Sequence, residues 1–579
     1  MSFMQEYERW LNSAALSEAE REELAAIQGD VKEIESRFYA PLEFGTAGLR
    51  GILGTGLNRM NIHTVRQATQ GIASLITGLG PEACRRGVAV CMDCRIKSDV
   101  FSQEVACVLA ANGIQVYLFD ALRPTPELSF AVRYLNCIAG VNITASHNPK
   151  EYNGYKVYWE DGAQIPPSHA ATVVKAIEDT DIFTGIQRTA FPEALAGGGV
   201  RLIGAEIDEA FLGRVLELMV NKEVVAQAAG DFKLVYTPFH GTGYKLIPEA
   251  LRRLGMKEIL CVPEQMVIDG TFPTVKSPNP ENEEGFALAI ALAQKENVDL
   301  IIGTDPDADR IGIMLKDKSG RYVRLSGNQV GVLLLDYIIA SRREKGLLPA
   351  KPVAIKTIVT TEMARKVGES NGIPVVDTFT GFKFMAEKIK QLAEDGNYQY
   401  LLAYEESYGY LMGDYCRDKD AVTATLMVTE MAAYYHRRGM TLYDAMAALY
   451  EKYGHYGEYT ENLVMPGLDG LAQMQALMKR LRETPPAKIA GTAVTRIRDY
   501  LTGETVDAGT REKSKMELSG SNVLYFELAD ATRFIVRPSG TEPKIKVYIL
   551  AQGETAAECQ DRVDRYSRAI RGVVGVEGA

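Results

Sequence analysis

Residues 87–119, GVAVCMDCRIKSDVFSQEVACVLAANGIQVYLF, decide the fold class of this chain. Residues 87–92 and 114–119 are short apolar runs with the character of strands, and residues 100–112 between them have the apolar spacing of a helix. A strand, a helix and a second strand in this order form a βαβ unit, in which helices cover the faces of the sheet. The stretch therefore predicts an α/β fold.

The same alternation returns further along the chain. Apolar strand-like runs lie at residues 232–236, 259–262, 300–303, 352–357, 373–376 and 400–403. Three α/β domains in series fit this pattern better than one very large sheet. From about residue 487 the pattern becomes strand-rich, at residues 488–498, 522–527, 533–536 and 545–550, and a helix closes the chain. This part predicts a smaller α+β domain.

Composition shifts place the expected boundaries. Ser17 with acidic residues after it is a helix cap, which favours a helical N-terminal extension. A glycine-rich loop lies at residues 196–199, and the turn signal DKSG at 317–320 predicts a hairpin. The predicted parts are a helical extension at 1–40, three α/β domains at 41–200, 201–318 and 319–455, and the α+β domain at 487–579.

Size and charge limit the classes of function. The chain has 579 residues, 46% of them hydrophobic, and a net charge of -11, which argues against nucleic acid and anionic membranes as partners. No apolar run approaches the ~20 residues that span a bilayer. The N-terminus lacks the basic start and apolar core of a signal peptide. We therefore expect a cytoplasmic protein.

The eight cysteines are scattered, which is typical of free thiols in a reducing compartment. Cys91 and Cys94 have CxxC spacing, so a redox pair or half of a zinc site is one hypothesis. The alternative is a buried strand, and it is favoured because no second CxxC completes four ligands.

The stretch TASHNP at residues 144–149 contains a candidate nucleophile, Ser146. A serine hydroxyl reacts poorly unless a base activates it or it already carries the group to be transferred. His147 and Lys156 are close enough in sequence to serve as proton or charge partners. An Asn-Pro turn with a capping serine is the alternative. This segment by itself does not decide between a nucleophilic serine and a turn with a capping serine.

The stretch DPDADR at residues 305–310 lies between two apolar runs. Carboxylates of Asp305, Asp307 and Asp309 in such a loop can converge on a hard cation. An EF-hand is excluded, because Arg310 and Lys316 stand where that loop needs glycine and glutamate. Three carboxylates around Mg²⁺, with Arg310 to neutralise a phosphoryl group, suit phosphoryl transfer. The alternative is a solvated acidic turn.

Two later stretches have the composition of ligand loops. EESYG at residues 405–409 follows a strand-like run, where its carboxylates can accept hydrogen bonds from sugar hydroxyls; a helix cap is the alternative. RPSGTEPK at residues 537–544 combines a guanidinium, two hydroxyls and a glycine, which is the composition of a phosphate cradle. A tight turn between strands is the alternative there.

These four stretches, in this order, resemble the α-D-phosphohexomutase superfamily, the phosphoglucomutase and phosphomannomutase enzymes. The resemblance covers nearly the whole chain, from FGTAGLR at residues 44–50 to the loop at Arg537. It implies four domains around a central cleft, of which three are α/β domains with mixed sheets and the last is a smaller α+β domain. The length and the EESYG stretch are similar to the longer phosphoglucomutase-type branch.

The resemblance also implies the roles of the site residues. Ser146 would be a phosphoserine that binds Mg²⁺ together with Asp305, Asp307 and Asp309. Lys156 and Arg310 would be charge or acid–base partners, and Arg50 and His147 further catalytic residues. The residues that would bind the substrate are Glu405 and Ser407 for sugar hydroxyls, and Arg537, Ser539, Gly540 and Thr541 for the phosphate that is not transferred.

The implied activity is that of an intramolecular phosphotransferase, an isomerase. It would interconvert glucose 1-phosphate and glucose 6-phosphate through the phosphoserine, with Mg²⁺ and glucose 1,6-bisphosphate as cofactors and a monomer or homodimer as the assembly. Phosphomannomutase, phosphopentomutase and glucose 1,6-bisphosphate synthase activities are alternatives. Two departures, Pro306 for a common glycine and Ala47 for a common serine, point to a subgroup. A phosphatase or a non-catalytic sugar-phosphate sensor would not need all four stretches.

Overall fold

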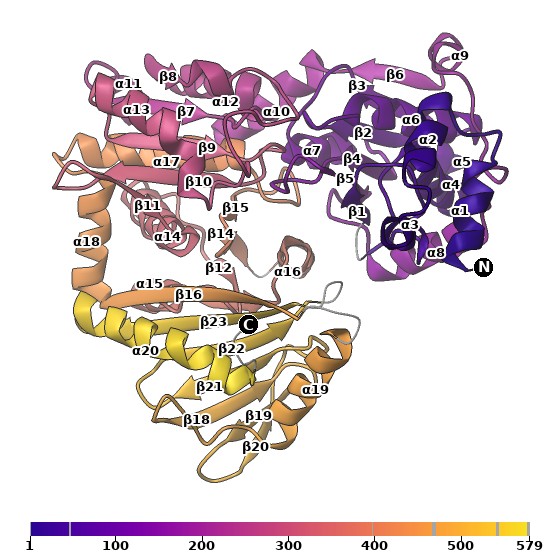
Figure 1. The fold of residues 1–579 in the computed structure, drawn as a ribbon. Helices are drawn as coiled ribbons and strands as arrows, with labels where there is room; N and C mark the ends of the chain where they lie inside the picture. Colours follow the sequence, from indigo (N-terminus) through magenta and orange to yellow (C-terminus); the bar gives the residue numbers. More distant parts are fainter. Residues whose placement is uncertain (1, 46–47, 397, 466–469, 540–543, 576–579) are drawn as a thin grey trace. The chain divides into compact units, whose positions relative to one another are not determined.

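The structure is a computed structural model that describes residues 2–45, 48–396, 398–465, 470–539 and 544–575 (Figure 1). The chain divides into two compact units. The first comprises residues 1–327 and 407–441, and the second comprises residues 328–406 and 442–579. None of the helices in the described part of the chain is long and apolar enough to cross a membrane.

The N-terminal extension is helical, as the cap signal at Ser17 predicted. Its helices are α1 (Phe3–Leu11), α2 (Glu18–Ala26) and α3 (Val31–Phe38). The Ser17 side chain accepts a hydrogen bond from the Glu20 amide, and the Glu20 carboxylate accepts one from the Ser17 amide. Trp10 is fully buried and packs edge-on against His63 of the first domain, with ring centroids 5.6 Å apart. The extension is therefore an integral part of the first unit.

The first domain is built on a mixed sheet of order β1-β5-β4-β2-β3-β6. Its strands are β1 (Gly48–Ile52), β2 (Val88–Met92), β3 (Val116–Phe119), β4 (Ala139–Ile143), β5 (Tyr152–Trp159) and β6 (Val200–Ile203). Neighbours among β2, β3, β4 and β6 pair in parallel, whereas β5 runs antiparallel to both β4 and β1. Because β6 pairs with β3, this sheet reaches Ile203, past the expected boundary at residue 200.

Helices cover this sheet. They are α4 (Ile62–Gly78), α5 (Pro81–Arg86), α6 (Ser98–Ala111), α7 (Thr125–Tyr134), α8 (Pro167–Glu178) and α9 (Phe191–Ala196). The predicted β-α-β stretch at residues 87–119 is confirmed as β2, α6 and β3. Helices α4 and α8 approach closely at Gly71, where an added Cβ would lie 2.7 Å from a side-chain carbon of Ile177.

The second domain has a mixed sheet of order β11-β10-β9-β7-β8. Its strands are β7 (Lys233–Thr237), β8 (Glu258–Cys261), β9 (Leu300–Thr304), β10 (Ile311–Lys316) and β11 (Tyr322–Leu325). The helices are α10 (Ala205–Glu217), α11 (Lys222–Ala228), α12 (Gly243–Leu254) and α13 (Ala287–Glu296), with short 3₁₀ turns at Pro263–Gln265 and Glu283–Phe286. The predicted hairpin joins β10 to β11.

A later segment of the chain completes the first unit. Strand β15 (Gly409–Leu411) leads to helix α17 (Ala421–His436), which packs against α10, α11 and α12. The first 13 residues of α17 are buried without a break, as expected of a helix enclosed on all sides.

The second unit begins with the third α/β region. Its elements are α14 (Gly327–Glu344), β12 (Pro352–Thr357), α15 (Met363–Asn371), β13 (Val375–Thr378), α16 (Phe382–Asp395), β14 (Gln399–Glu405) and α18 (Leu442–Tyr453). Strand β12 pairs in parallel with β13 on one side and β14 on the other.

The C-terminal domain has an antiparallel sheet of order β16-β23-β22-β21-β18-β19-β20. Its elements are β16 (His455–Val464), α19 (Gly470–Glu483), β17 (Lys488–Ile489), β18 (Thr492–Asp499), β19 (Glu504–Asp507), β20 (Lys513–Lys515), β21 (Leu524–Leu528), β22 (Arg533–Pro538), β23 (Lys544–Gly553) and α20 (Ala556–Val574). Helix α20, yellow in Figure 1, packs against β23 and β16. Three α/β domains followed by a smaller sheet domain are therefore confirmed as the fold class.

Candidate active site

Ser146 lies in the loop that joins β4 to β5 in an antiparallel pair. Its φ of 53° is in the left-handed region, and its amide donates to the Thr144 Oγ1 at 2.8 Å. The side chain is buried, its Oγ donates to Asp305 Oδ2 at 2.9 Å, and His147 Nδ1 lies 3.1 Å from the same Oγ. The hydroxyl therefore faces the aspartate loop, and its side chain caps no helix.

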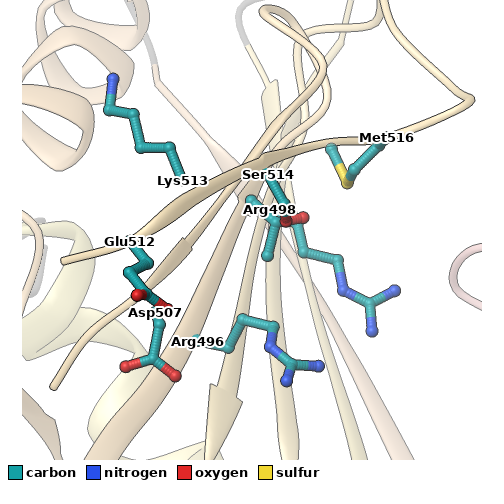
Figure 2. Close-up of a pocket in the computed structure, with 8 residues that line it drawn as sticks. Arg496, Arg498, Asp507, Glu512, Lys513, Ser514 and Met516 are labelled. Atoms are coloured by element: carbon teal, nitrogen blue, oxygen red, sulfur yellow. The ribbon is translucent and has the colours of Figure 1, made fainter. Parts of the chain in front are cut away.

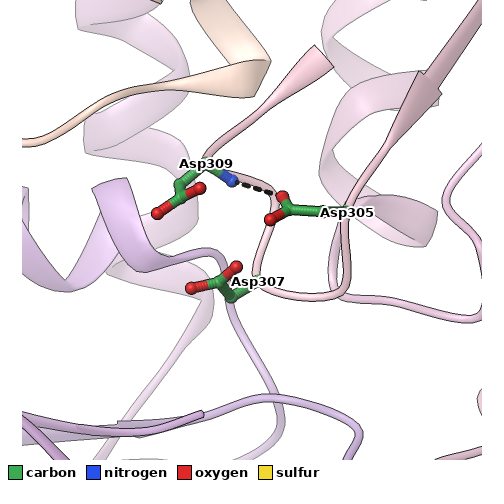
Figure 3. A group of neighbouring side chains, drawn as sticks. All are labelled: Asp305, Asp307 and Asp309. Carbon is green, nitrogen blue, oxygen red and sulfur yellow. Dashed lines mark hydrogen bonds between the residues drawn. The ribbon is translucent and has the colours of Figure 1, made fainter. Parts of the chain in front are cut away.

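The three predicted aspartates converge in the loop between β9 and β10 (Figure 3). Each offers a carboxylate oxygen, and these oxygens all lie within 4.8 Å of one another. Asp305 and Asp307 are 0% exposed and Asp309 is 2% exposed, so the hypothesis of a solvated acidic turn is wrong. Amides of Asp309 and Arg310 donate to Asp305 Oδ1 at 3.1 Å, which fixes one carboxylate of the group.

The arrangement fits a hard divalent cation. Oδ1 of Asp307 and Oδ1 of Asp309 are buried and have no hydrogen-bond partner within the described residues. Buried carboxylate oxygens without donors are costly unless a cation neutralises them. Oxygen ligands from carboxylates are those that Mg²⁺ and Ca²⁺ prefer. The group can therefore hold a metal ion.

Burial and neighbouring charges shift the pKa values of Asp305 and Asp307 in opposite directions. Burial and the negative charges of Asp307 and Asp309 raise the pKa of Asp305 well above its usual range. Burial would also raise the pKa of Asp307, but the charge and hydrogen bond of Lys156, with Nζ 2.8 Å from Oδ2, lower it below its usual range. Lys156 therefore lies at the aspartates, and its predicted role as a charge or acid–base partner stays a prediction.

The other predicted cations of the first unit surround the same loop. Arg50 on β1 donates to Asn148 Oδ1 at 3.1 Å, next to the serine loop. Arg310 lies with Nε 3.8 Å from Asp309 Oδ1 and pairs with Glu281 at 3.3 Å. Burial and the positive charges of Arg310 and Arg50 lower the pKa of His147 well below 6.5, which favours a neutral ring at pH 7.

Two side chains at the aspartates were not predicted. Lys419 Nζ lies 3.0 Å from Asp309 Oδ2, and Thr125 Oγ1 donates to Asp307 Oδ2 at 2.7 Å. Lys419 stands in the charged run RDKD at residues 417–420, which was a usable signal. Thr125, the first residue of α7, gives no signal in the sequence beyond a helix start.

The predicted substrate residues lie mainly in the second unit. Glu405 is buried at the end of β14, and Arg537 on β22 has Nη1 3.5 Å from the Tyr548 hydroxyl. The Ser539 amide donates to the Lys544 carbonyl at 2.7 Å, which closes the base of the predicted phosphate loop. Gly540 and Thr541 lie outside the described residues, as does Ala47. Ser407 belongs to the first unit.

The carboxylates of the sugar stretch have different surroundings. Glu406 Oε2 accepts hydrogen bonds from Thr357, the last residue of β12, at 3.0 Å and from Thr360, in the turn that follows, at 3.3 Å. Burial and the charge of Glu406 raise the pKa of Tyr548, while Arg537 opposes the increase. Tyr548 thus lies within electrostatic reach of both predicted substrate loops of the second unit.

A separate hollow of about 710 Å³ lies on the C-terminal sheet (Figure 2). Its basic lining is paired within the same domain: Arg498 with Glu527, and Lys513 with Glu504 at 2.9 Å. None of the predicted site residues that the structure describes lines it.

The comparisons with known proteins cover the whole domain series. Models of the family described as phosphoglucomutase/phosphomannomutase match its α/β/α domain I at residues 41–182, domain II at 209–320, domain III at 326–453 and the C-terminal domain at 472–565. Domain III thus includes both the segment 407–441 of the first unit and the start of the second unit.

Curated relatives and solved structures agree with this match. A phosphoglucomutase of Staphylococcus aureus (strain MRSA252) is 36% identical over 530 residues, which covers 90% of this chain and 91% of the relative. One of Staphylococcus saprophyticus is 35% identical over 528 residues, covering 91% and 93%. The fold is also similar to that of a putative phosphomannomutase from Thermus thermophilus, with a TM-score of 0.67, 22% identity and coverage of 93% and 99%. With its four domains in order and its ordered motifs, the chain belongs to the phosphoglucomutase/phosphomannomutase family.

Proposed function

We propose that this chain is a phosphohexomutase that interconverts α-D-glucose 1-phosphate and glucose 6-phosphate through a phosphoserine at Ser146. The observation that carries the proposal is the 2.9 Å contact of Ser146 Oγ with a buried group of three aspartates. A serine hydroxyl at a carboxylate metal site is suited to carrying a phosphoryl group. Glucose is the first choice of sugar because relatives at 36% identity are named phosphoglucomutases.

The proposed reaction has two transfers. In the first, the bond between phosphorus and Ser146 Oγ breaks, a bond to the free hydroxyl oxygen of the sugar monophosphate forms, and the hydroxyl proton passes to the serine oxygen. His147, with Nδ1 3.1 Å from Oγ, would relay that proton. In the second transfer, Ser146 takes the other phosphoryl group from the sugar 1,6-bisphosphate, and the proton returns to the sugar.

The residues around Ser146 provide the charge that this chemistry needs. Lys156, Arg310 and Arg50 supply positive charge for the three oxygens of the transferring group. Mg²⁺ held by Asp305, Asp307 and Asp309 supplies further neutralisation of the same oxygens when bound. These three carboxylates, two of them with a buried oxygen lacking a donor among the described residues, are the ligands that we propose.

The second unit is proposed to hold the sugar and its second phosphate. Glu405, with Ser407 of the first unit, would accept or donate hydrogen bonds to sugar hydroxyls. Arg537, Ser539, Gly540 and Thr541 would bind the phosphate that is not transferred, with bidentate contacts from the guanidinium. We further propose a cytoplasmic monomer or homodimer with glucose 1,6-bisphosphate as the activating cofactor.

Phosphorus NMR tests the activity directly. The protein is given Mg²⁺, a trace of glucose 1,6-bisphosphate, and glucose 1-phosphate, mannose 1-phosphate or ribose 1-phosphate in parallel tubes. Conversion of glucose 1-phosphate to glucose 6-phosphate without free phosphate is expected, and faster than conversion of the other two sugars. Release of inorganic phosphate would indicate a phosphatase instead. Faster turnover of mannose 1-phosphate or ribose 1-phosphate would show that this sugar phosphate, and not glucose 1-phosphate, is the preferred substrate.

A further inference from the structure

Arg95 lies just after β2, next to Cys94, and its side chain is 0% exposed. Among the described residues, the hydrogen bonds of its guanidinium go to main-chain carbonyl oxygens of the loop that carries Ser146 and of Tyr152, the first residue of β5. Nη1 donates to Pro149 and Tyr152, both at 2.9 Å, and Nη2 donates to Ser146 at 2.6 Å and to Asn148. One side chain therefore binds four carbonyls between residues 146 and 152.

These hydrogen bonds replace those that a helix or strand would supply. The residues between β4 and β5 have no regular structure, and the buried carbonyl of Ser146 in particular would be costly without a donor. A guanidinium has five N–H donors in one plane, so it can bind several carbonyls at fixed positions, whereas a lysine ammonium has three donors and no such plane. The φ of 53° at Ser146 is an unfavourable conformation that surrounding contacts must maintain.

The guanidinium is itself held from two other directions. Its Nε lies 3.5 Å from Asp93 Oδ2, and Asp93 Oδ1 accepts from the Arg95 amide at 2.9 Å. The ring of Phe272, in the second domain, lies under it, with 5.2 Å between Cζ and the ring centroid. At Gly270 an added Cβ would lie 2.5 Å from the Cys94 carbonyl oxygen, so the Phe272 segment lies directly against the Arg95 segment.

We propose that Arg95 is a positioning residue that holds the Ser146 loop so that Oγ faces the three aspartates. Arg95 does not touch the reacting atoms, and it acts through the four carbonyls of the loop. Its effect on turnover rests on the proposed mutase function, but its effect on the loop does not. Because a displacement of about 1 Å can cost 10²-fold in rate, loss of this clamp should lower phosphoryl transfer while the substrate contacts of the second unit remain.

The test is Arg95→Lys, which keeps the charge and loses the planar fork. Arg59→Lys is the matched control, because Arg59 is also buried and donates to the carbonyls of Ser36, on α3, at 3.1 Å and of Asn58, after β1, at 3.0 Å. Hydrogen exchange of peptides covering residues 144–152 is measured together with kcat and KM for glucose 1-phosphate. Arg95→Lys is expected to speed exchange in this loop about tenfold and to lower kcat about 10²-fold, with KM changed by less than about threefold. Arg59→Lys is expected to change none of these.

A second variant decides the question if Arg95→Lys does not fold. Phe272→Leu leaves the arginine in place and removes the ring beneath it, so it should raise loop exchange and lower kcat by about threefold each. Exchange in the loop at the wild-type rate in a folded Arg95→Lys protein, or in Phe272→Leu, would overturn the proposal. Faster exchange throughout the first domain would overturn it too, since Arg95 would then support the fold generally. Absence of turnover in wild type would overturn only the proposed function, because loop exchange still tests Arg95.

Discussion

At Asp307 the two carboxylate oxygens have different roles. Oδ2 accepts hydrogen bonds from Lys156 at 2.8 Å and from Thr125 at 2.7 Å, so the side chain is held firmly. Oδ1 is buried without a donor among the described residues and belongs to the group of three aspartates. The protein thus fixes the carboxylate with one oxygen and leaves the other for a cation.

Asp307→Asn tests this division at the level of one residue. The amide is nearly isosteric, so the fold should persist, but the charge that attracts a divalent ion is lost. Mg²⁺ affinity measured by calorimetry should fall more than about tenfold, and mutase turnover should fall with it. Asp299→Asn, at an exposed position before β9, is the control, and it should keep the wild-type Mg²⁺ affinity and turnover. Unchanged Mg²⁺ affinity in Asp307→Asn would show that the ion binds elsewhere.

At the scale of elements, a buried ion group lies near the end of β12. Lys356, the fifth residue of β12, is 0% exposed and pairs with Glu362 at 2.9 Å and Asp377 at 3.0 Å. Glu362 precedes α15, and Asp377 lies on β13. A buried ion group of this kind is strongly destabilised when one partner loses its charge. The group therefore ties β12, β13 and α15 together.

The acid stability of the second unit should depend on Glu362. Burial raises the pKa of Glu362, but the charges of Lys356 and Arg365 outweigh it and lower this pKa to about 2, from 4.5. The charged carboxylate therefore stabilises the fold fully above pH 4.5, and this contribution is lost as pH falls toward 2. In urea unfolding, Glu362→Gln should be less stable than wild type above pH 4.5, with a gap that narrows toward pH 2. Glu369→Gln, at an exposed position on α15, is the control. A difference in unfolding free energy between Glu362→Gln and wild type that does not vary with pH would contradict the account.

The N-terminal helices are expected to act on stability and not on chemistry. Trp10 is fully buried against Phe38, His63 and Phe183. Trp10→Ala should cost about 3–5 kcal/mol of unfolding free energy, because it empties a large buried volume. Turnover per folded molecule should stay close to wild type when stability is measured by thermal and urea unfolding. A large loss of kcat in fully folded Trp10→Ala would show that the extension also positions the site.

Periodicity predicted many of the strands but not which elements pack against one another. The run at 352–357 matches β12 at both ends, because a short apolar run between turn residues is a strong strand signal. The apolar sequence of α17 indicates that this helix is buried, but it does not show which elements pack against it. Its packing against α10, α11 and α12 depends on tertiary contacts between residues about 200 apart in the chain, which no local pattern encodes.

At the scale of the whole molecule, the first unit gathers chemistry from distant segments. The aspartate loop at residues 305–309 is contacted by side chains that are far from it in the sequence: Ser146 is hydrogen-bonded to Asp305, and Lys419 forms an ion pair with Asp309. Motif composition predicted the serine and the aspartates because their chemistry is recognisable in order. It missed Thr125 and Arg95, because a helix-starting threonine and an arginine whose side-chain hydrogen bonds go to main-chain carbonyls have no signature in sequence.

Transfer of a phosphoryl group to Ser146 is the most direct test of the central claim. Dephosphorylated protein is mixed with Mg²⁺ and glucose 1,6-bisphosphate, and its intact mass and peptides are followed by mass spectrometry, with Ser146→Ala as the control. The account predicts the gain of one phosphoryl group at Ser146, its loss on addition of glucose 1-phosphate, and no gain in Ser146→Ala. Mutase turnover without phosphate on Ser146, or turnover that persists in Ser146→Ala, would contradict it.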